Sequence, residues 1–340
     1  MTATITSTPP TATRPGVGPT GYTPTSDATR LRGGGGERRS TRFLALAGAL
    51  AALLLAFFAV VRPWYRQWGA TSVEAGEALP GDEIVWNAAG QETRAITIHA
   101  NVDRVWPWVA QLGQDRGGFY SYDLLENLVG CEMPTVDVLR PEKQQWRIGD
   151  KLWMYPPNKA GGVGFATLRV LVPGRALAFG TRAPGTSLRE PEDGSWAFVL
   201  VPIGDSATRF IVRGRGAAGR SLLGVAFDRA IFEPMHFAME RRTMIGIAQL
   251  AEGRDRGRAT NHLQLLLWTI TFGMIVSAAV MVLRRRRAWR QPLAGFVAAA
   301  VLFQILTLLQ PPLSIGVALV AAVVGTVWWP ANREAVGGKR

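Results

Sequence analysis

Residues 93–108 read TRAITIHANVDRVWPW, and this stretch decides the fold of the central part of the chain. Its first seven residues alternate between apolar and polar side chains, which predicts a β-strand with one buried face. Asn101 can then cap a helix that runs to about Leu112. Pro107 removes a backbone donor, so we expect a kink or a late start of that helix. A strand followed directly by a helix therefore opens the domain.

A second short helix and a series of strands are predicted next. Asp123 can cap this helix, Glu126 lies three residues further on as in a capping box, and Gly130 can end it. From about residue 136 to residue 213, apolar and β-branched clusters alternate with turn residues at the spacing of an antiparallel meander. We expect strands at 151–155, 165–172, 176–180, 196–201 and 208–212.

The domain closes with a long helix. Apolar residues recur at helical spacing between about Leu223 and Glu252, and Pro234 can break the helix. The order is one strand, two helices, a run of antiparallel strands and a long closing helix. This order predicts an α+β fold in which a curved sheet wraps around one helix.

Apolar runs without a single charge flank this domain. They lie at 43–61 before it and at 263–283, 293–309 and 313–329 after it. At about 1.5 Å per residue, each can cross or nearly cross a hydrocarbon core of about 30 Å. We therefore expect about four transmembrane helices, with residues 63–260 as the domain between the first and second. Residues 1–42, rich in Thr, Pro, Gly and Arg, are predicted to be a disordered tail.

The formal net charge of +13 belongs to the membrane flanks. Residues 63–262 hold 23 Lys and Arg against 22 Asp and Glu, whereas the rest of the chain holds 15 basic and 3 acidic residues. The near-neutral domain argues against a nucleic-acid surface. Short cytoplasmic loops retain Lys and Arg, and Arg284–Arg287 form the densest basic block. This predicts a multi-pass protein of the cell membrane with both termini cytoplasmic and the domain outside.

Cysteine and histidine usage points away from metal chemistry. The single cysteine, Cys131, excludes an intramolecular disulfide and a zinc site made of several cysteines, and we interpret it as a small buried hydrophobe. His236 and Glu240 lie four residues apart and share a helical face, but a metal site would need a third ligand. No metal and no cofactor is predicted.

Several short motifs occur in a recognisable order. They are Trp68–Thr71, Leu79–Glu83, Arg94–Ala100 with Val105–Trp108, Arg116–Asp123 with Leu125–Asn127, Pro141-Glu142 with Ile148–Asp150, and Phe232–Phe237 with Met239–Arg241. In this order the chain resembles the START-like superfamily known as SRPBCC, in its polyketide cyclase/dehydrase-type and lipid-transport-type branch. The resemblance covers about Trp68–Gly253 and leaves the apolar runs outside.

The resemblance implies a helix-grip (START-like) fold, in which the sheet and the long last helix enclose an apolar pocket. Members of this superfamily bind lipids, sterols, polyketides or similar molecules, and some catalyse reactions on them. Tyr120 and Tyr122 follow two glycines, and a tyrosine hydroxyl can orient a carbonyl or head group in such a pocket. The predicted ligand-binding residues are Tyr120, Tyr122, Asp123, Trp153, His236 and Met239. For Asp123, helix capping is the stronger interpretation.

Three alternative functions follow. The first, which we favour, is a membrane-tethered binding domain for a lipid or another apolar small molecule. The second is an enzyme of cyclase, dehydratase or hydrolase type, which needs at least two acid–base groups in one cavity. Its candidate groups are His236, Glu240, Tyr120 and Asp123, of which His236 and Glu240 are the catalytic candidates. The third is a structural or regulatory membrane protein whose domain binds a protein partner.

Overall fold

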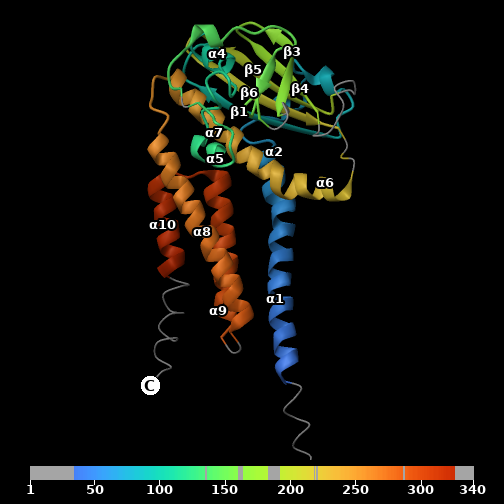
Figure 1. Ribbon diagram of the computed structural model, residues 1–340, viewed down its shortest axis with the longest axis vertical. Helices are drawn as coiled ribbons and strands as arrows, with labels where there is room; N and C mark the ends of the chain where they lie inside the picture. The colour runs from blue at the N-terminus through green and yellow to red at the C-terminus, as the bar shows by residue number, and fades with distance from the viewer. Residues whose placement is uncertain are drawn as a thin grey trace, which may run out of the picture.

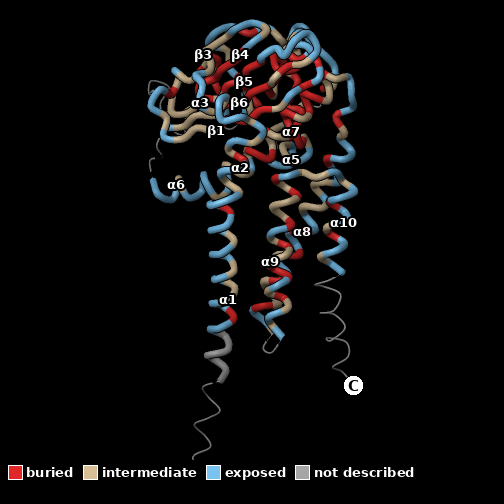
Figure 2. The backbone as a smooth tube through the Cα atoms, turned by 180° about the vertical axis from the view of Figure 1, so that it is seen from behind, coloured by how far each residue is buried: buried red, intermediate tan, exposed pale blue. Residues whose placement is uncertain are grey.

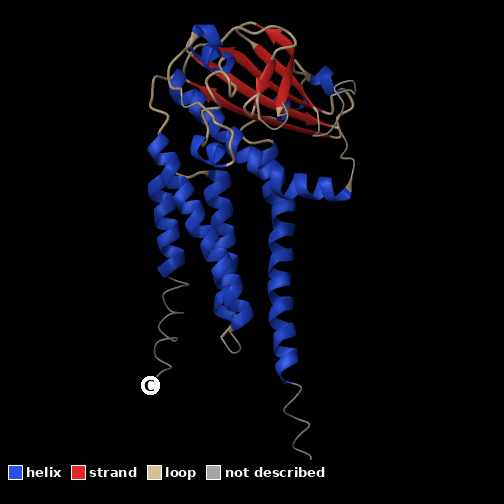
Figure 3. Cartoon of the chain, in the orientation of Figure 1, coloured by secondary structure: helices blue, strands red, loops and turns tan. Residues whose placement is uncertain are grey.

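The chain forms a sheet-containing domain that sits on one end of a group of long helices (Figure 1 and Figure 3). The structure is a computed structural model that describes residues 34–325 apart from 135, 160–163, 183–191, 218, 220 and 286–287. The sheet and the helices packed against it are α+β in architecture, consistent with a helix-grip fold.

The sheet has six strands, and every neighbouring pair is antiparallel. The strands are β1 (Gly90–Ile98), β2 (Lys151–Trp153), β3 (Phe165–Val172), β4 (Ala176–Thr181), β5 (Gly194–Ile203) and β6 (Ala207–Gly216). Their order in the sheet is β1-β6-β5-β4-β3-β2, so the strands after β1 form a meander and β1 joins it beside β6. Every strand predicted from the sequence is present. β5 and β6 extend beyond their predicted ends, because each of them is paired with a neighbouring strand on both sides.

The two faces of the sheet are covered by different parts of the chain. On β1, Ile96 and Ile98 contact the main core, which the sheet shares with α4 (Val102–Ala110) and α7 (Glu233–Ala251). The intervening Ala95 packs on the opposite face, as strand alternation requires.

The segment before β1 covers that opposite face through α3 (Ser72–Gly76) and the 3₁₀ turn η2 (Asp82–Val85). It lies very close to the sheet. A Cβ on Gly69, which has a φ of +70°, would come within 2.2 Å of the Ala95 carbonyl oxygen. Only glycine suits this position, because the backbone is left-handed and the space is closed.

Two short helices lie between β1 and β2, and their starts differ in how they are capped. Asn101 accepts a hydrogen bond from the Arg104 amide (3.1 Å), which confirms the predicted cap of α4. This helix starts at Val102 and runs through Pro107, so the expected late start is not found. The predicted capping by Asp123 and Glu126 is wrong: α5 (Asp123–Leu128) has no side-chain cap, because the Asp123 carboxylate is bound elsewhere.

The long closing helix is continuous. It consists of α6 (Leu222–Phe227), a π-helical segment η5 (Asp228–Phe232) and α7. The break that Pro234 could have caused does not occur. Pro234 lies in the first turn of α7, where it lacks only its backbone N–H, and the wider π-turn before it does not need this donor.

The apolar helices leave the domain on one side. They are α1 (Gly34–Ala56), which continues through η1 (Phe57–Val61) and α2 (Arg62–Arg66), then α8 (Arg258–Arg284), α9 (Arg290–Gln304) with η6 (Ile305–Leu309), and α10 (Leu313–Val323). Three of them, spanning Ser40–Arg66, Arg258–Arg284 and Arg290–Leu309, are long and apolar enough to cross a membrane.

The expected number of about four spans therefore becomes three among the described residues. The described part of α10 has 11 residues and is too short to count as a span, and residues 326–329 of the fourth predicted run lie outside the described residues. At the other end, helix α1 already begins at Gly34 and not at Phe43. The rest of the predicted tail, residues 1–33, also lies outside the described residues.

Buried contacts fix the domain on the helices. Phe237 of α7 is fully buried and packs with Phe57, Tyr65 and Leu308 from three different helical segments. The Gln310 side chain donates a hydrogen bond to the Ala238 carbonyl (2.7 Å). Figure 2 shows the contrast between the buried interior of the domain and α1, most of which is exposed.

Candidate functional site

The interior between the sheet and α7 is occupied by packed aromatic side chains. Tyr120 is 1% exposed and its ring contacts Trp108 edge-on, with ring centroids 5.8 Å apart. Phe198 stacks on Phe210 from the neighbouring strand (6.4 Å) and meets Phe179 edge-on (6.2 Å). Tyr120 therefore lies in the hydrophobic core between the sheet and α7.

A buried ion pair connects the first strand to the closing helix. The Arg94 guanidinium donates to a Glu240 carboxylate oxygen (2.6 Å) and to Glu92 (2.7 Å), and the Trp196 indole N–H donates to the second Glu240 oxygen (2.8 Å). The side chains of Arg94 and Glu240 are each 1% exposed. Burial opposes the charge on Glu240, but Arg94 outweighs this effect and holds the pKa of Glu240 below its ordinary value.

Four rings form a row from the core to the surface, which we call the aromatic row: Phe119, Trp196, His236 and Phe232. Phe119 stacks against Trp196 (6.0 Å), Trp196 meets His236 edge-on (5.4 Å), and His236 stacks on Phe232 (5.7 Å). Phe119 is buried at 6% exposure, whereas Phe232 is 48% exposed. The row thus joins the interior of the grip to the start of α7, at the level where α1 meets the domain (Figure 1).

Tyr122 lies at the junction between the domain and the apolar helix α8. Its hydroxyl donates to the Gln264 side chain (2.9 Å) and its ring contacts Trp268 (4.8 Å), both on α8. The neighbouring Ser121 donates to the Met239 carbonyl of α7 (2.9 Å). This loop therefore ties α7 and α8 together.

Asp123 binds a buried arginine. Two Arg256 nitrogens donate to its two carboxylate oxygens (3.1 and 2.7 Å), and Arg256 also pairs with Asp137 (3.0 Å). One carboxylate oxygen of Glu126 is buried and has no hydrogen-bond partner among the described residues. Burial, and next the Asp123 charge, raise the pKa of Glu126 to about 8.

The remaining predicted residues are dispersed. Trp153 lies on the edge strand β2, where its ring contacts Phe165 (5.0 Å) and Lys151. Met239 lies on α7 beside Ser121. Of the predicted set, only His236 belongs to the aromatic row. Cys131, predicted to be buried, is half-buried.

The sequence reasoning missed Trp196, Phe119 and Phe232 as a site. A ring contact between β5, a loop and η5 has no signature in sequence spacing, so the sequence does not predict that these three side chains meet. Arg94 could have been recognised from the sequence, because it lies on the same, inward face of the strand as Ile96 and Ile98. A charge at such a strand position predicts a buried partner.

Of the acid–base candidates of the enzyme alternative, His236 and Glu240 lie four residues apart on α7 and interact electrostatically, whereas the others are held elsewhere. Glu240 is bound by Arg94 and Trp196, Asp123 by Arg256, and Tyr120 packs in the core. Within the described part of the chain, no three His, Cys, Asp or Glu side chains come together as a possible metal site. Among the described residues, Asp123 and Tyr120 are therefore separate from the pair formed by His236 and Glu240.

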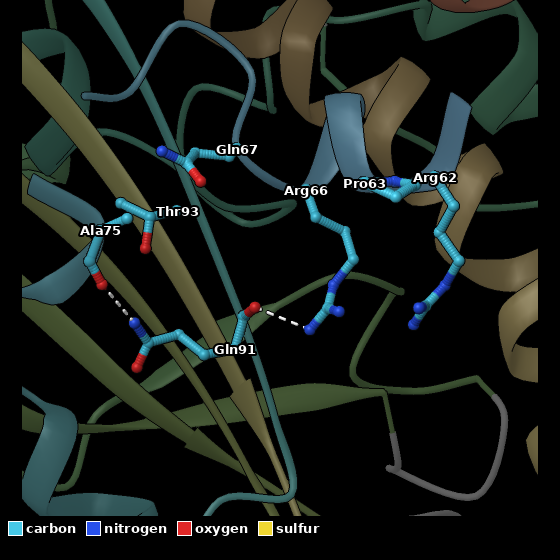
Figure 4. Close-up of a pocket in the computed structure, with 7 residues that line it drawn as sticks. All are labelled: Arg62, Pro63, Arg66, Gln67, Ala75, Gln91 and Thr93. Carbon is cyan, nitrogen blue, oxygen red and sulfur yellow. Dashed lines mark hydrogen bonds between the residues drawn. The ribbon is translucent and has the colours of Figure 1, made fainter. Parts of the chain in front are cut away.

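A polar cavity of about 320 Å³ lies where α2 meets the sheet (Figure 4). Its lining is Arg62, Pro63, Arg66, Gln67, Ala75, Gln91 and Thr93. Arg66 donates to the Gln91 carbonyl (2.7 Å), and Arg62 donates to Glu233 (2.9 Å). Two guanidinium groups and two amides suit an acidic or strongly polar group better than an apolar chain.

Comparison with known proteins gives similarity to solved structures alone. No family model matches the chain, and no curated protein matches it. A protein from Mesorhizobium loti is 12% identical, with 48% of this chain and 99% of that one covered and a TM-score of 0.27. A Polyketide_cyc-like protein from Corynebacterium glutamicum is 13% identical (48% and 85% covered, TM-score 0.22). The di-domain ARO/CYC protein BexL is 16% identical (48% and 46% covered, TM-score 0.26). Similarities of this size carry no information about ligand or reaction.

Proposed function

We propose that this chain is a membrane-tethered binding domain for a lipid or another apolar small molecule. The aromatic row carries the proposal, because its rings lead from the buried Phe119 to the exposed Phe232 on the side of the domain nearest the membrane helices. Flat aromatic faces give an apolar chain or ring system a large contact area. We place the ligand along the row, between the buried Phe119 and the exposed Phe232.

The polar surroundings of the row suit such a ligand. Apolar sites hold a few polar groups that fix orientation. The Trp196 indole is held in place by its bond to Glu240, and Arg94 in turn neutralises that carboxylate. His236 remains as the polar group of the row, with its ring between Trp196 and Phe232. A ligand with one acceptor at the end of an apolar body fits this arrangement.

The tether consists of the three long apolar helices. We place both termini in the cytoplasm and the domain outside, because the arginine block between α8 and α9 belongs on the inner side. Reporter fusions at the domain and at the carboxyl terminus test this topology. A cytoplasmic signal from the domain fusion would contradict it.

Native mass spectrometry of the full chain, purified in mild detergent, tests the ligand. We compare wild type with Phe232→Ser, which shortens the aromatic row, and with Ile148→Ser, which removes an exposed apolar side chain before β2. Wild type and Ile148→Ser should retain the same apolar molecule, and Phe232→Ser should retain several-fold less. Equal retention by Phe232→Ser, or no bound molecule in wild type, would count against the proposal.

A structural or regulatory role is the second candidate. The observation that favours it is the extent of the junction, where Tyr122 bonds to α8 and Gln310 bonds to α7. Such contacts would transmit a change in the domain to the membrane helices. Wild-type protein without any apolar ligand, together with capture of a defined protein partner, would favour this candidate.

A further inference from the structure

The first part of the closing helix is an apolar surface that the described part of the chain leaves exposed. The large side chains of α6 and η5 are strongly exposed: Leu222 is 89% exposed, Leu223 85%, Phe227 61% and Ile231 54%. Met235, on the first turn of α7, is 52% exposed. Single exposed apolar residues are ordinary on a protein surface, but a contiguous group marks an interaction site.

These side chains form one stripe. Leu223, Phe227, Ile231 and Met235 are spaced by four residues, so they lie along one side of the helix. The α-helical turn makes such a row drift around the helix, and the wider π-turn of η5 offsets that drift. The opposite side carries Glu233, which is paired with Arg62 of α2, and it therefore faces the protein.

The stripe faces the side from which the membrane helices leave. Ala238 lies three residues after Met235 on this side of the helix, and its carbonyl accepts the hydrogen bond from Gln310 at the end of η6. Figure 1 and Figure 3 show α6 crosswise to α1, at the height where α1 enters the domain. Trp64 of α2, which continues α1, is 39% exposed. It lies where this helix enters the domain, a position typical of aromatic residues at a membrane interface.

We infer that α6 and η5 form an interfacial helix, with the stripe lying in the leaflet directly beneath the domain. The inference rests on the tether in the proposed function and is independent of the ligand. A neutral bilayer is the expected partner, because Asp228 and Arg229 are the only charges of α6 and η5 and they offset each other. Insertion would place Phe232, the outer end of the aromatic row, at the boundary between head groups and acyl chains.

Fluorescence quenching in phosphatidylcholine nanodiscs tests this placement. Single cysteines are introduced into the full chain with Cys131→Ser and labelled with an environment-sensitive dye. Leu223→Cys reports on the stripe, and Arg229→Cys, exposed on the other side of the same helix, is its matched control. Leu50→Cys on α1 reports on the tether. Spin-labelled lipid quenches dyes in the bilayer, and iodide quenches dyes in water.

The expected result is lipid quenching at both Leu223 and Leu50, with iodide quenching at Leu223 about threefold weaker than at Arg229, as for a helix buried to a depth of ~5–10 Å. Equal iodide quenching at Leu223 and Arg229, with Leu50 quenched by lipid, would overturn the inference and leave the tether intact. Protection from both quenchers at Leu223 would also overturn it, because a protein would then cover the stripe. Iodide access at Leu50 would contradict the tether itself.

Discussion

At the scale of single residues, the Arg94–Glu240 pair connects the fold to the aromatic row. The pair is buried, and Trp196 depends on Glu240 for the position of its indole. A buried pair gives little net stability compared with apolar residues, but removal of one partner is costly because a charge is left without compensation. We interpret the pair as a device that fixes the orientation of Trp196.

Arg94→Met should lower the free energy of unfolding by about 3–5 kcal/mol, because Glu240 and Glu92 are left without their cation. Lys159→Met provides the control, since the pair between Lys159 and Glu132 is exposed and should contribute no more than about 1 kcal/mol. Thermal unfolding of the purified chain followed by tryptophan fluorescence measures both. Similar losses in the two variants would contradict this interpretation.

Glu126 should make the domain less stable as the pH rises. Its carboxyl holds a proton more tightly in the folded chain, with a pKa of about 8, than in the unfolded chain, where about 4.3 is usual. The folded state therefore binds more protons between these values, and the free energy of unfolding falls from about pH 4.3 to about pH 8 and is level above. Glu126→Gln, which mimics the protonated form, should raise the melting temperature at pH 8.5 and raise it less at pH 5. An equal effect at both pH values would rule out this ionisation.

At the scale of elements, α7 is positioned by a very close contact with the loop before α5. A Cβ on Gly246 would lie 2.4 Å from the Tyr120 carbonyl oxygen and 3.0 Å from the Tyr120 Cβ. Backbone cannot move out of the way as a flexible side chain can. Glycine at this point therefore sets the distance between the closing helix and the core.

Gly246→Ala should cost about 1–3 kcal/mol of stability, as overpacking of a core does. Gly273→Ala, in the middle of α8, is the matched control because a Cβ there has no neighbour within 4 Å. Chemical denaturation monitored by circular dichroism measures the difference. A Gly246→Ala variant as stable as Gly273→Ala would mean that α7 can shift without cost.

Most elements of the fold could be predicted from local patterns in the sequence. Strand alternation, the Asn101 cap and the apolar runs depend on neighbouring residues. The structure agrees with the first two and, among the described residues, with three of the four runs. The capping prediction for Asp123 failed because its partner, Arg256, lies 133 residues away. The predicted break at Pro234 was wrong because the sequence pattern does not indicate the π-turn that accommodates the proline.

The candidate site was much less predictable than the fold. The predicted residues were chosen as neighbours in a motif, and the structure distributes them over the core, the sheet edge and the junction with α8. The aromatic row instead joins four separate positions of the chain through ring contacts. His236 alone was found, because its chemistry made it a candidate without knowledge of its neighbours.

At the scale of the whole molecule, the domain packs on the ends of the long apolar helices. Phe237 joins them, since it stacks on Tyr65 (5.1 Å) and packs with Leu308. The loop at Tyr122 adds a second attachment through α8. His236 of the aromatic row directly precedes Phe237, so a change at the row lies next to the contacts with the long apolar helices.

Phe237→Ala should loosen both sides of this junction, at a cost of about 3–5 kcal/mol for a buried phenylalanine. Hydrogen exchange measured by mass spectrometry should become faster in α2 and in η6 together. Trp86→Ala, which removes a ring that is 79% exposed, should leave both segments unchanged. Faster exchange in only one of the two segments would mean that Phe237 does not join them.

The central proposal is that an apolar molecule lies along the aromatic row, and photolabelling with a lipid tests it most directly. The full chain is placed in nanodiscs with a phosphatidylcholine that carries a diazirine on its acyl chain, irradiated, digested and mapped by mass spectrometry. We predict label on the peptide that contains Trp196, in addition to the membrane helices, and several-fold less label on that peptide in Phe232→Ser. Label on the membrane helices with none on the Trp196 peptide would contradict the claim.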